Sequence, residues 1–168
     1  MSVAEPAEFN WREALLVYTR PKVLGMVFLG FSGGLPFLLV FSTLSAWLTE
    51  SGVSRGTIGF FAWVGITYSI KVAWAPVVDR LHLPVLTRIF GQRRGWMLVG
   101  QGGIALGLLA MALLDPATEL LWIALAALLV AFSSATQDIA IDAYRIEAVV
   151  PKYQGAMSAA YIFGYRVA

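Results

Sequence analysis

Long apolar runs, separated by short polar loops, constrain this chain more than any other feature. They cover about residues 23–47, 57–78, 96–114 and 120–144, and a fifth occupies residues 153–168. A transmembrane α-helix needs about 20 mostly apolar residues, so each of the first four is long enough to cross a bilayer. The sequence therefore predicts an all-α polytopic membrane protein with four complete transmembrane helices and part of a fifth.

Two segments are predicted. Residues 1–22 are polar, and Asn10 followed by Glu13 matches the start of a short interfacial helix. Residues 23–168 form the transmembrane bundle. Arg166 falls roughly 18 Å into the fifth run at 1.5 Å per residue, near the middle of a bilayer. We therefore expect the sequence to be the beginning of a longer protein, cut within its fifth helix.

The distribution of basic residues predicts the orientation. Nine lie in segments on the same side as the N-terminus, against Arg55 alone on the other. Cytoplasmic loops carry an excess of Lys and Arg, so the N-terminus is predicted to be cytoplasmic. The same distribution accounts for the pI near 9.1 without a nucleic-acid partner.

The composition also narrows the chemistry. The chain has no cysteine and a single histidine, His82, which excludes disulfides and cysteine-based metal sites. No metal site and no cofactor are predicted.

Glycine and proline mark the helix contacts. Gly30 and Gly34 form one G-x-x-x-G pair and Gly103 and Gly107 another, a spacing that lets two membrane helices approach closely. Pro36 removes a backbone hydrogen bond and predicts a kink in the first span.

Charges inside the predicted spans are the main functional candidates, because a charge in a bilayer is costly. Lys71 and Asp138 are expected at similar depth, about 12 and 10 Å from the cytoplasmic ends of their helices. We therefore predict that Lys71 pairs with Asp138 or Asp142. The two aspartates lie on one side of a helix with Arg145. Ionising both carboxyl groups at once would be energetically costly in this poorly solvated place. Asp138, Asp142 and Lys71 are thus candidates for proton coupling; a static ion pair that fixes helix register is the alternative.

Polar side chains nearby are candidates for binding a substrate. They are Gln137, Arg166, Tyr68 and Tyr161, with Tyr165 as a further hydrogen-bonding group. A guanidinium suits an anionic group, although Arg166 could instead bond to backbone carbonyls. Tyrosines in membrane spans are also common packing residues.

The loop after the second span carries a recognisable pattern. Asp79-Arg80 followed by Gly91-Gln92-Arg93-Arg94-Gly95 resembles the signature of the major facilitator superfamily. Ala75 replaces the usual glycine, and about ten additional residues separate the two halves. This longer form resembles the AmpG-type muropeptide permeases, as do residues 30–36, 42–48 and 71–76. The most specific stretch is 134–147, Ser-Ala-Thr-Gln-Asp-Ile-Ala-Ile-Asp-Ala-Tyr-Arg-Ile-Glu.

The resemblance implies the N-terminal bundle of a twelve-helix transporter of the bacterial inner membrane. Such permeases import anhydro-muropeptides by proton symport and are expected to be monomers. By resemblance, Gln137, Asp138 and Asp142 fall in the polar motif of helix four. Asp79, Arg80, Arg93 and Arg94 fall in the conformational latch between helices two and three; a purely topological role for the arginines is the alternative.

Three other functions stay open. A related branch carries acetyl-CoA, so acetyl-CoA or another anionic solute is an alternative substrate. Asp138-x-x-x-Asp142 is similar to the Mg²⁺-binding motif of membrane prenyltransferases, although a second Asp-rich motif is missing from this sequence. A membrane sensor that keeps the fold without transport is the third.

Overall fold

The computed structural model describes residues 11–168, apart from the Glu13 side chain, and the described chain is α-helical. The predicted capping pair Asn10–Glu13 lies outside the described residues. The helices are α1 (Trp11–Leu16), α2 (Pro21–Leu38), α3 (Leu44–Glu50), α4 (Arg55–Phe61), α5 (Ile66–Arg80), α6 (Pro84–Phe90), α7 (Gln92–Leu113), α8 (Leu120–Glu147) and α9 (Pro151–Val167).

Four continuous helical segments are long and apolar enough to cross a membrane: Pro21–Glu50, Arg55–Arg80, Gln92–Leu113 and Leu120–Glu147. They match the four complete spans that the sequence predicts, and the protein is a multi-pass membrane protein. Many large apolar side chains on these helices are exposed, as expected where lipid rather than water surrounds them.

The first span is irregular where the sequence places its proline. Pro36 lies inside α2, and the chain passes through a π-helical turn, Leu39–Thr43, before continuing as α3. Proline lacks the N–H that would donate to the Ser32 carbonyl one turn earlier, and the wide turn begins three residues after it.

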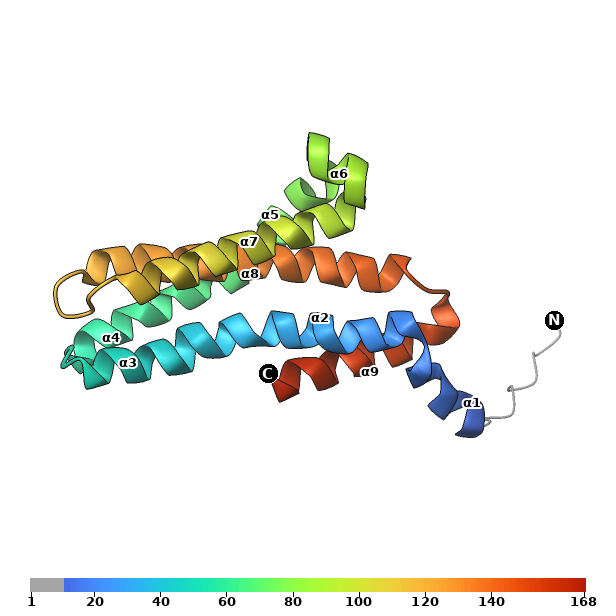
Figure 1. The fold of residues 1–168 in the computed structure, drawn as a ribbon, viewed down its shortest axis with the longest axis horizontal. Helices are drawn as coiled ribbons and strands as arrows, with labels where there is room; N and C mark the ends of the chain where they lie inside the picture. Colours follow the sequence, from blue (N-terminus) through green and yellow to red (C-terminus); the bar gives the residue numbers. More distant parts are fainter. Residues whose placement is uncertain (1–10) are drawn as a thin grey trace.

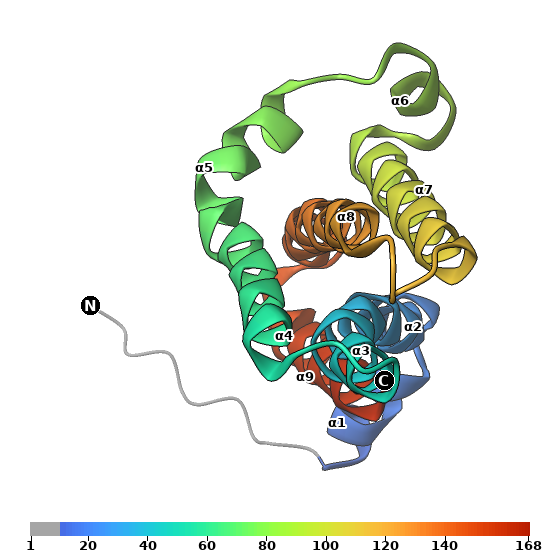
Figure 2. The ribbon, with the colours of Figure 1, turned by 90° about the vertical axis from the view of Figure 1, so that its left-hand side faces the viewer.

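Helix α8 lies in the middle of the bundle. Seen along the helices, α5 stands on one side of it and α7 on the other, while α2 and α9 lie together below (Figure 2). Among the described helices, the α7–α8 and α2–α9 pairs share the most extensive contacts, and they run side by side in Figure 1. Helix α6, which connects α5 to α7, projects from the side of the bundle (Figure 1).

Glycines explain why α2 and α9 are so close. A Cβ atom at Gly30 would overlap the backbone carbonyl of Tyr161, and one at Gly164 would overlap that of Val27. At Gly34 it would lie 2.5 Å from the carbonyl oxygen of Tyr165. The predicted Gly30/Gly34 contact is therefore observed, and it fixes the positions of the α9 tyrosines relative to α2.

The second glycine pair lies between α7 and α8. At Gly103 a Cβ would overlap the Ser133 hydroxyl, and at Gly107 it would lie 2.6 Å from a methyl group of Val130. This packing sets one side of α8 firmly against α7.

Candidate functional site

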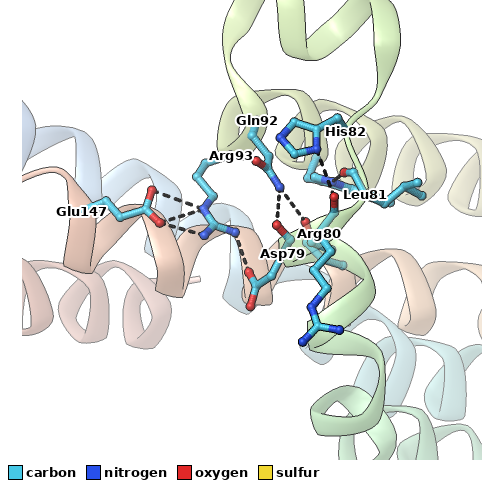
Figure 3. A network of polar contacts seen from close by, with 9 residues as sticks. Asp79, Arg80, Leu81, His82, Gln92, Arg93 and Glu147 are labelled. Atoms are coloured by element: carbon cyan, nitrogen blue, oxygen red, sulfur yellow. Dashed lines mark hydrogen bonds and ion pairs between the residues drawn. The ribbon is translucent and has the colours of Figure 1, made fainter.

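An ionic network joins three helices at one end of the bundle (Figure 3). The Arg93 guanidinium at the start of α7 binds Asp79 at the end of α5, with Nη1 2.5 Å from Oδ1. Its Nη2 lies 2.7 Å from Oε1 of Glu147, the last residue of α8, and its Nε also donates to Glu147. One planar guanidinium thus holds two carboxylates, a geometry that lysine cannot reproduce.

Uncharged groups reinforce the same end. The Gln92 side chain donates to the backbone carbonyls of Asp79 (2.5 Å) and Val78 (3.3 Å) (Figure 3). The indole N–H of Trp96 donates to the Leu81 carbonyl at 3.0 Å. These bonds satisfy carbonyls that the end of α5 leaves without helical partners.

Only two of the four residues predicted for the latch belong to this network. Arg80 points away from Arg93 (Figure 3), and Arg94 lines a cleft of about 330 Å³ with Gln101 and Tyr144. Glu147 belongs to the network but was not predicted as a latch residue. Glu147 could have been predicted from its position, because it ends the polar stretch 134–147 on the side of the membrane where the arginines are expected.

A second group of polar residues lies within the membrane-spanning part of α8. Ser133, Ser134, Thr136, Gln137 and Asp138 are all buried. Asp138 receives a hydrogen bond from the Tyr161 hydroxyl on α9 at 3.4 Å. A Cβ at Gly33 on α2 would lie 3.0 Å from Asp138 Oδ1 and 3.2 Å from that hydroxyl, so glycine leaves room for both polar groups.

Several buried polar atoms in this region have no hydrogen-bond partner among the described residues. The Gln137 side chain donates to Ser32 Oγ at 2.9 Å, but its Oε1 is without a partner, as is the indole nitrogen of Trp74. The hydroxyls of Tyr68 and Ser134 interact with each other, but outside normal hydrogen-bond geometry. Native proteins leave few such groups, and each calls for an explanation such as a water molecule or a ligand.

Lys71 and Asp138 do not form the predicted ion pair, although the ammonium is near enough to act electrostatically on the carboxyl group. Within the part of the chain that the structure describes, no carboxylate forms an ion pair with Lys71. Asp142 pairs instead with Arg145, at 3.3 Å and one turn along the same helix. Similar depth in a membrane does not fix the direction in which a side chain leaves its helix, and Asp138 is enclosed on the α2 and α9 side.

The other predicted binding residues are divided between two environments. Tyr161 and Gln137 lie at the buried polar group, and Tyr68 packs there against Phe37 and Phe41, at ring-centre distances of 5.8 and 6.1 Å. Arg166, near the end of α9, is exposed.

Comparison with known proteins identifies the family of this chain. Residues 22–116 match the family described as acetyl-coenzyme A transporter 1. Over 153 residues the chain is 39% identical to the anhydromuropeptide permease of Escherichia coli K12. The aligned segment covers 91% of this chain and 30% of that protein. Over 146 residues it is 38% identical to putative transporter AmpG 4 of Rickettsia conorii, covering 87% of this chain and 35% of that protein. The chain thus spans about a third of the length of these curated relatives.

Proposed function

Because the chain belongs to the acetyl-coenzyme A transporter 1 family, we propose that it is the N-terminal bundle of a secondary transporter that imports anhydromuropeptides together with protons. The relatives at 38–39% identity are named anhydromuropeptide permease and AmpG transporter, which favours a muropeptide as the solute. The protein would lie in the bacterial inner membrane as a monomer with a cytoplasmic N-terminus, as the distribution of basic residues suggests.

One observation carries the proton-coupling part of this proposal. Asp138 is a carboxylic acid buried among membrane helices, and none of the ion pairs between described residues includes it. Its one hydrogen bond comes from an uncharged group, Tyr161. An ionisable residue inside a membrane suggests function by default, and Asp138 can gain or lose a proton without breaking an ion pair. Asp142 and Lys71 would tune that exchange electrostatically.

The ionic network has a separate part in the proposal. Alternating access requires one group of helices to rock against another around a central site. Arg93, Asp79 and Glu147 would hold the cytoplasmic ends of α5, α7 and α8 together in one conformation and release them in another. Arg80 and Arg94 would contribute positive charge at the membrane surface.

The test is transport by the full-length protein in proteoliposomes. We expect labelled anhydromuropeptide to accumulate when an inward proton gradient is imposed, and accumulation to stop when a protonophore is added. Uptake that ignores the gradient would contradict proton coupling, and no uptake by a folded sample would contradict the substrate.

The family description itself favours a second candidate, acetyl-coenzyme A. Arg166, which is exposed, would then bind an anionic group of the solute. Uptake of labelled acetyl-coenzyme A in the same vesicles, with no competition from anhydromuropeptide, would establish this alternative. The relatives are named permeases and transporters, so no observation favours the prenyltransferase-like enzyme.

A further inference from the structure

The short helix α6 packs against the start of α7 and presents an apolar face to its surroundings. Leu86 lies against α7, because a Cβ atom added at Gly95 would be 3.2 Å from the Leu86 Cβ. Val85 and Ile89 share one face of α6, and they are 68% and 65% exposed. The helix also projects from the side of the bundle (Figure 1). An exposed apolar face at the end of several membrane spans is suited to the membrane–water interface.

The contact between α6 and α7 places Arg94 at the same level. Gly95, which touches α6, is the next residue of α7, so an interfacial α6 puts Arg94 level with the lipid headgroups. Arg94 is exposed, and none of the ion pairs between described residues includes it. A guanidinium binds a phosphate group with two parallel hydrogen bonds. Arg94 is therefore placed to bind a phosphate at the membrane surface.

The cleft of about 330 Å³ that Arg94 lines has the shape and polarity of an amphiphile site. Most of the side chains around it are apolar: Leu29, Phe90, Met97 and Leu98. Along α7 the lining runs from Arg94 at the membrane surface to Gln101, seven residues or about 10 Å deeper. None of the described residues that line it is acidic. A positive group at the outer end of an apolar cleft complements a phosphate head with an acyl tail.

We infer that this cleft binds an anionic phospholipid, whose phosphate contacts Arg94 and whose acyl chain lies against Met97 and Leu98. Basic clefts between membrane helices near the cytoplasmic surface bind anionic headgroups. A zwitterionic lipid fits less well, because its own ammonium group would be repelled by the guanidinium. The site does not depend on which solute the protein carries. A bound lipid would steady the start of α7, where Arg93 holds the ionic network.

The experiment titrates phosphatidylglycerol into the full-length protein in uncharged detergent micelles and follows the melting temperature, which rises when a ligand binds the folded state. We expect phosphatidylglycerol to act at lower concentration than phosphatidylcholine. Arg94→Gln should raise the concentration needed for half of the effect about fivefold, because one basic residue near a lipid surface contributes roughly 1 kcal/mol. Leu98→Ser, which removes part of the apolar wall, should raise it too. Arg88→Gln is the matched control and should leave it unchanged, because Arg88 is exposed on α6 but does not line the cleft.

Equal titrations of wild type and Arg94→Gln would overturn the inference, because the lipid would then bind elsewhere or another part of the full-length protein would cover the cleft. Equal effects of Arg94→Gln and Arg88→Gln would also overturn it, since only the overall positive charge would then matter. Glycerol 3-phosphate, which lacks acyl chains, should not raise the melting temperature. A rise as large as that caused by the lipid would identify a site for a soluble anion instead. The assay needs no transport, so failure of the proposed function would leave its result unchanged.

Discussion

The two polar regions of this protein satisfy their polar groups in opposite ways. At the end of α5, α7 and α8, one guanidinium binds two carboxylates, and neighbouring side chains bond to the exposed carbonyls of α5. In the buried face of α8, the hydrogen bond that Asp138 accepts from Tyr161 is long, and the amide oxygen of Gln137 has no partner among the described residues. The first region is complete within the chain, whereas the second leaves hydrogen-bonding capacity unused.

This difference assigns the two regions different tasks. Partnered charges at an accessible surface hold helix ends together and can be exchanged for water when the helices move, at a modest energetic cost. Unpartnered groups in a low-dielectric interior are too costly to be retained without a use. The comparison predicts that changes in the first region alter the rate of conformational change, and that changes in the second alter solute and proton binding.

The largest expected effect comes from Asp138→Asn in the buried region. Asparagine keeps the shape and can still accept the Tyr161 hydrogen bond, but it cannot carry a proton. We expect proton-driven accumulation to fall at least about 100-fold, equivalent to roughly 2.7 kcal/mol, while exchange of labelled for unlabelled solute without a gradient continues. Accumulation at wild-type levels would remove Asp138 from the coupling mechanism.

Arg93→Lys is expected to have the next largest effect, and it acts on the ionic network. Lysine keeps the charge but cannot bind both Asp79 and Glu147 with a planar fork. Because all three side chains are partly exposed to solvent, we expect a loss of only about 1 kcal/mol in stability. Maximal uptake should fall about fivefold with an unchanged KM, as roughly 1 kcal/mol would produce.

Arg94→Lys is the matched control, because Arg94 lies next in the sequence but outside the network. Equal effects of the two substitutions would show that the arginines act only through their charge at the membrane surface. A raised KM for Arg93→Lys would contradict the assignment of solute binding to the buried region and of conformational change to the network.

How far the sequence anticipates each region depends on the kind of information needed. Helix lengths, the Gly30/Gly34 contact and the disturbance after Pro36 follow from local rules of hydropathy and backbone geometry, and the structure agrees with them. The sequence predicts two of the three charged residues of the network, since the pattern at residues 79–95 identifies Arg93 and Asp79 but not Glu147.

The described residues do not form the short Lys71–aspartate ion pair that residue counting predicts, and the reason is physical. Depth along the membrane follows from residue counting, but the rotation of each helix about its axis does not. That rotation places Asp138 against Gly33 and Tyr161, and it brings the side chains of Ser134 and Tyr68 together. Both arrangements depend on how α2, α5, α8 and α9 pack, which no single segment encodes.

Gly33→Ala tests the space inside the buried region. The added Cβ would lie within 3.0–3.2 Å of both Asp138 Oδ1 and the Tyr161 hydroxyl, so one of them must shift. We expect proton-driven uptake to fall about threefold, or roughly 0.7 kcal/mol. Gly25→Ala is the control, because an added Cβ there would meet no atom of a neighbouring helix within 4 Å. A loss of the same size in this variant would mean that α2 tolerates no added methyl group, and it would contradict a functional space at Gly33.

The smallest effect is expected for Lys71→Ala. This substitution tests directly whether the buried region, unlike the ionic network, lacks paired charges. If Lys71 were a member of a buried ion pair, its removal would leave an uncompensated charge and destabilise the protein by about 3–5 kcal/mol. Because Lys71 has no ion pair with the described residues, we expect the free energy of unfolding to change by less than about 1 kcal/mol. Lys71→Met, which keeps the length of the side chain, controls for lost packing. The measurement is thermal unfolding of both variants in detergent. If both lose much stability, and if adding Asp138→Asn restores it, then the buried region is held together by paired charges, as the ionic network is.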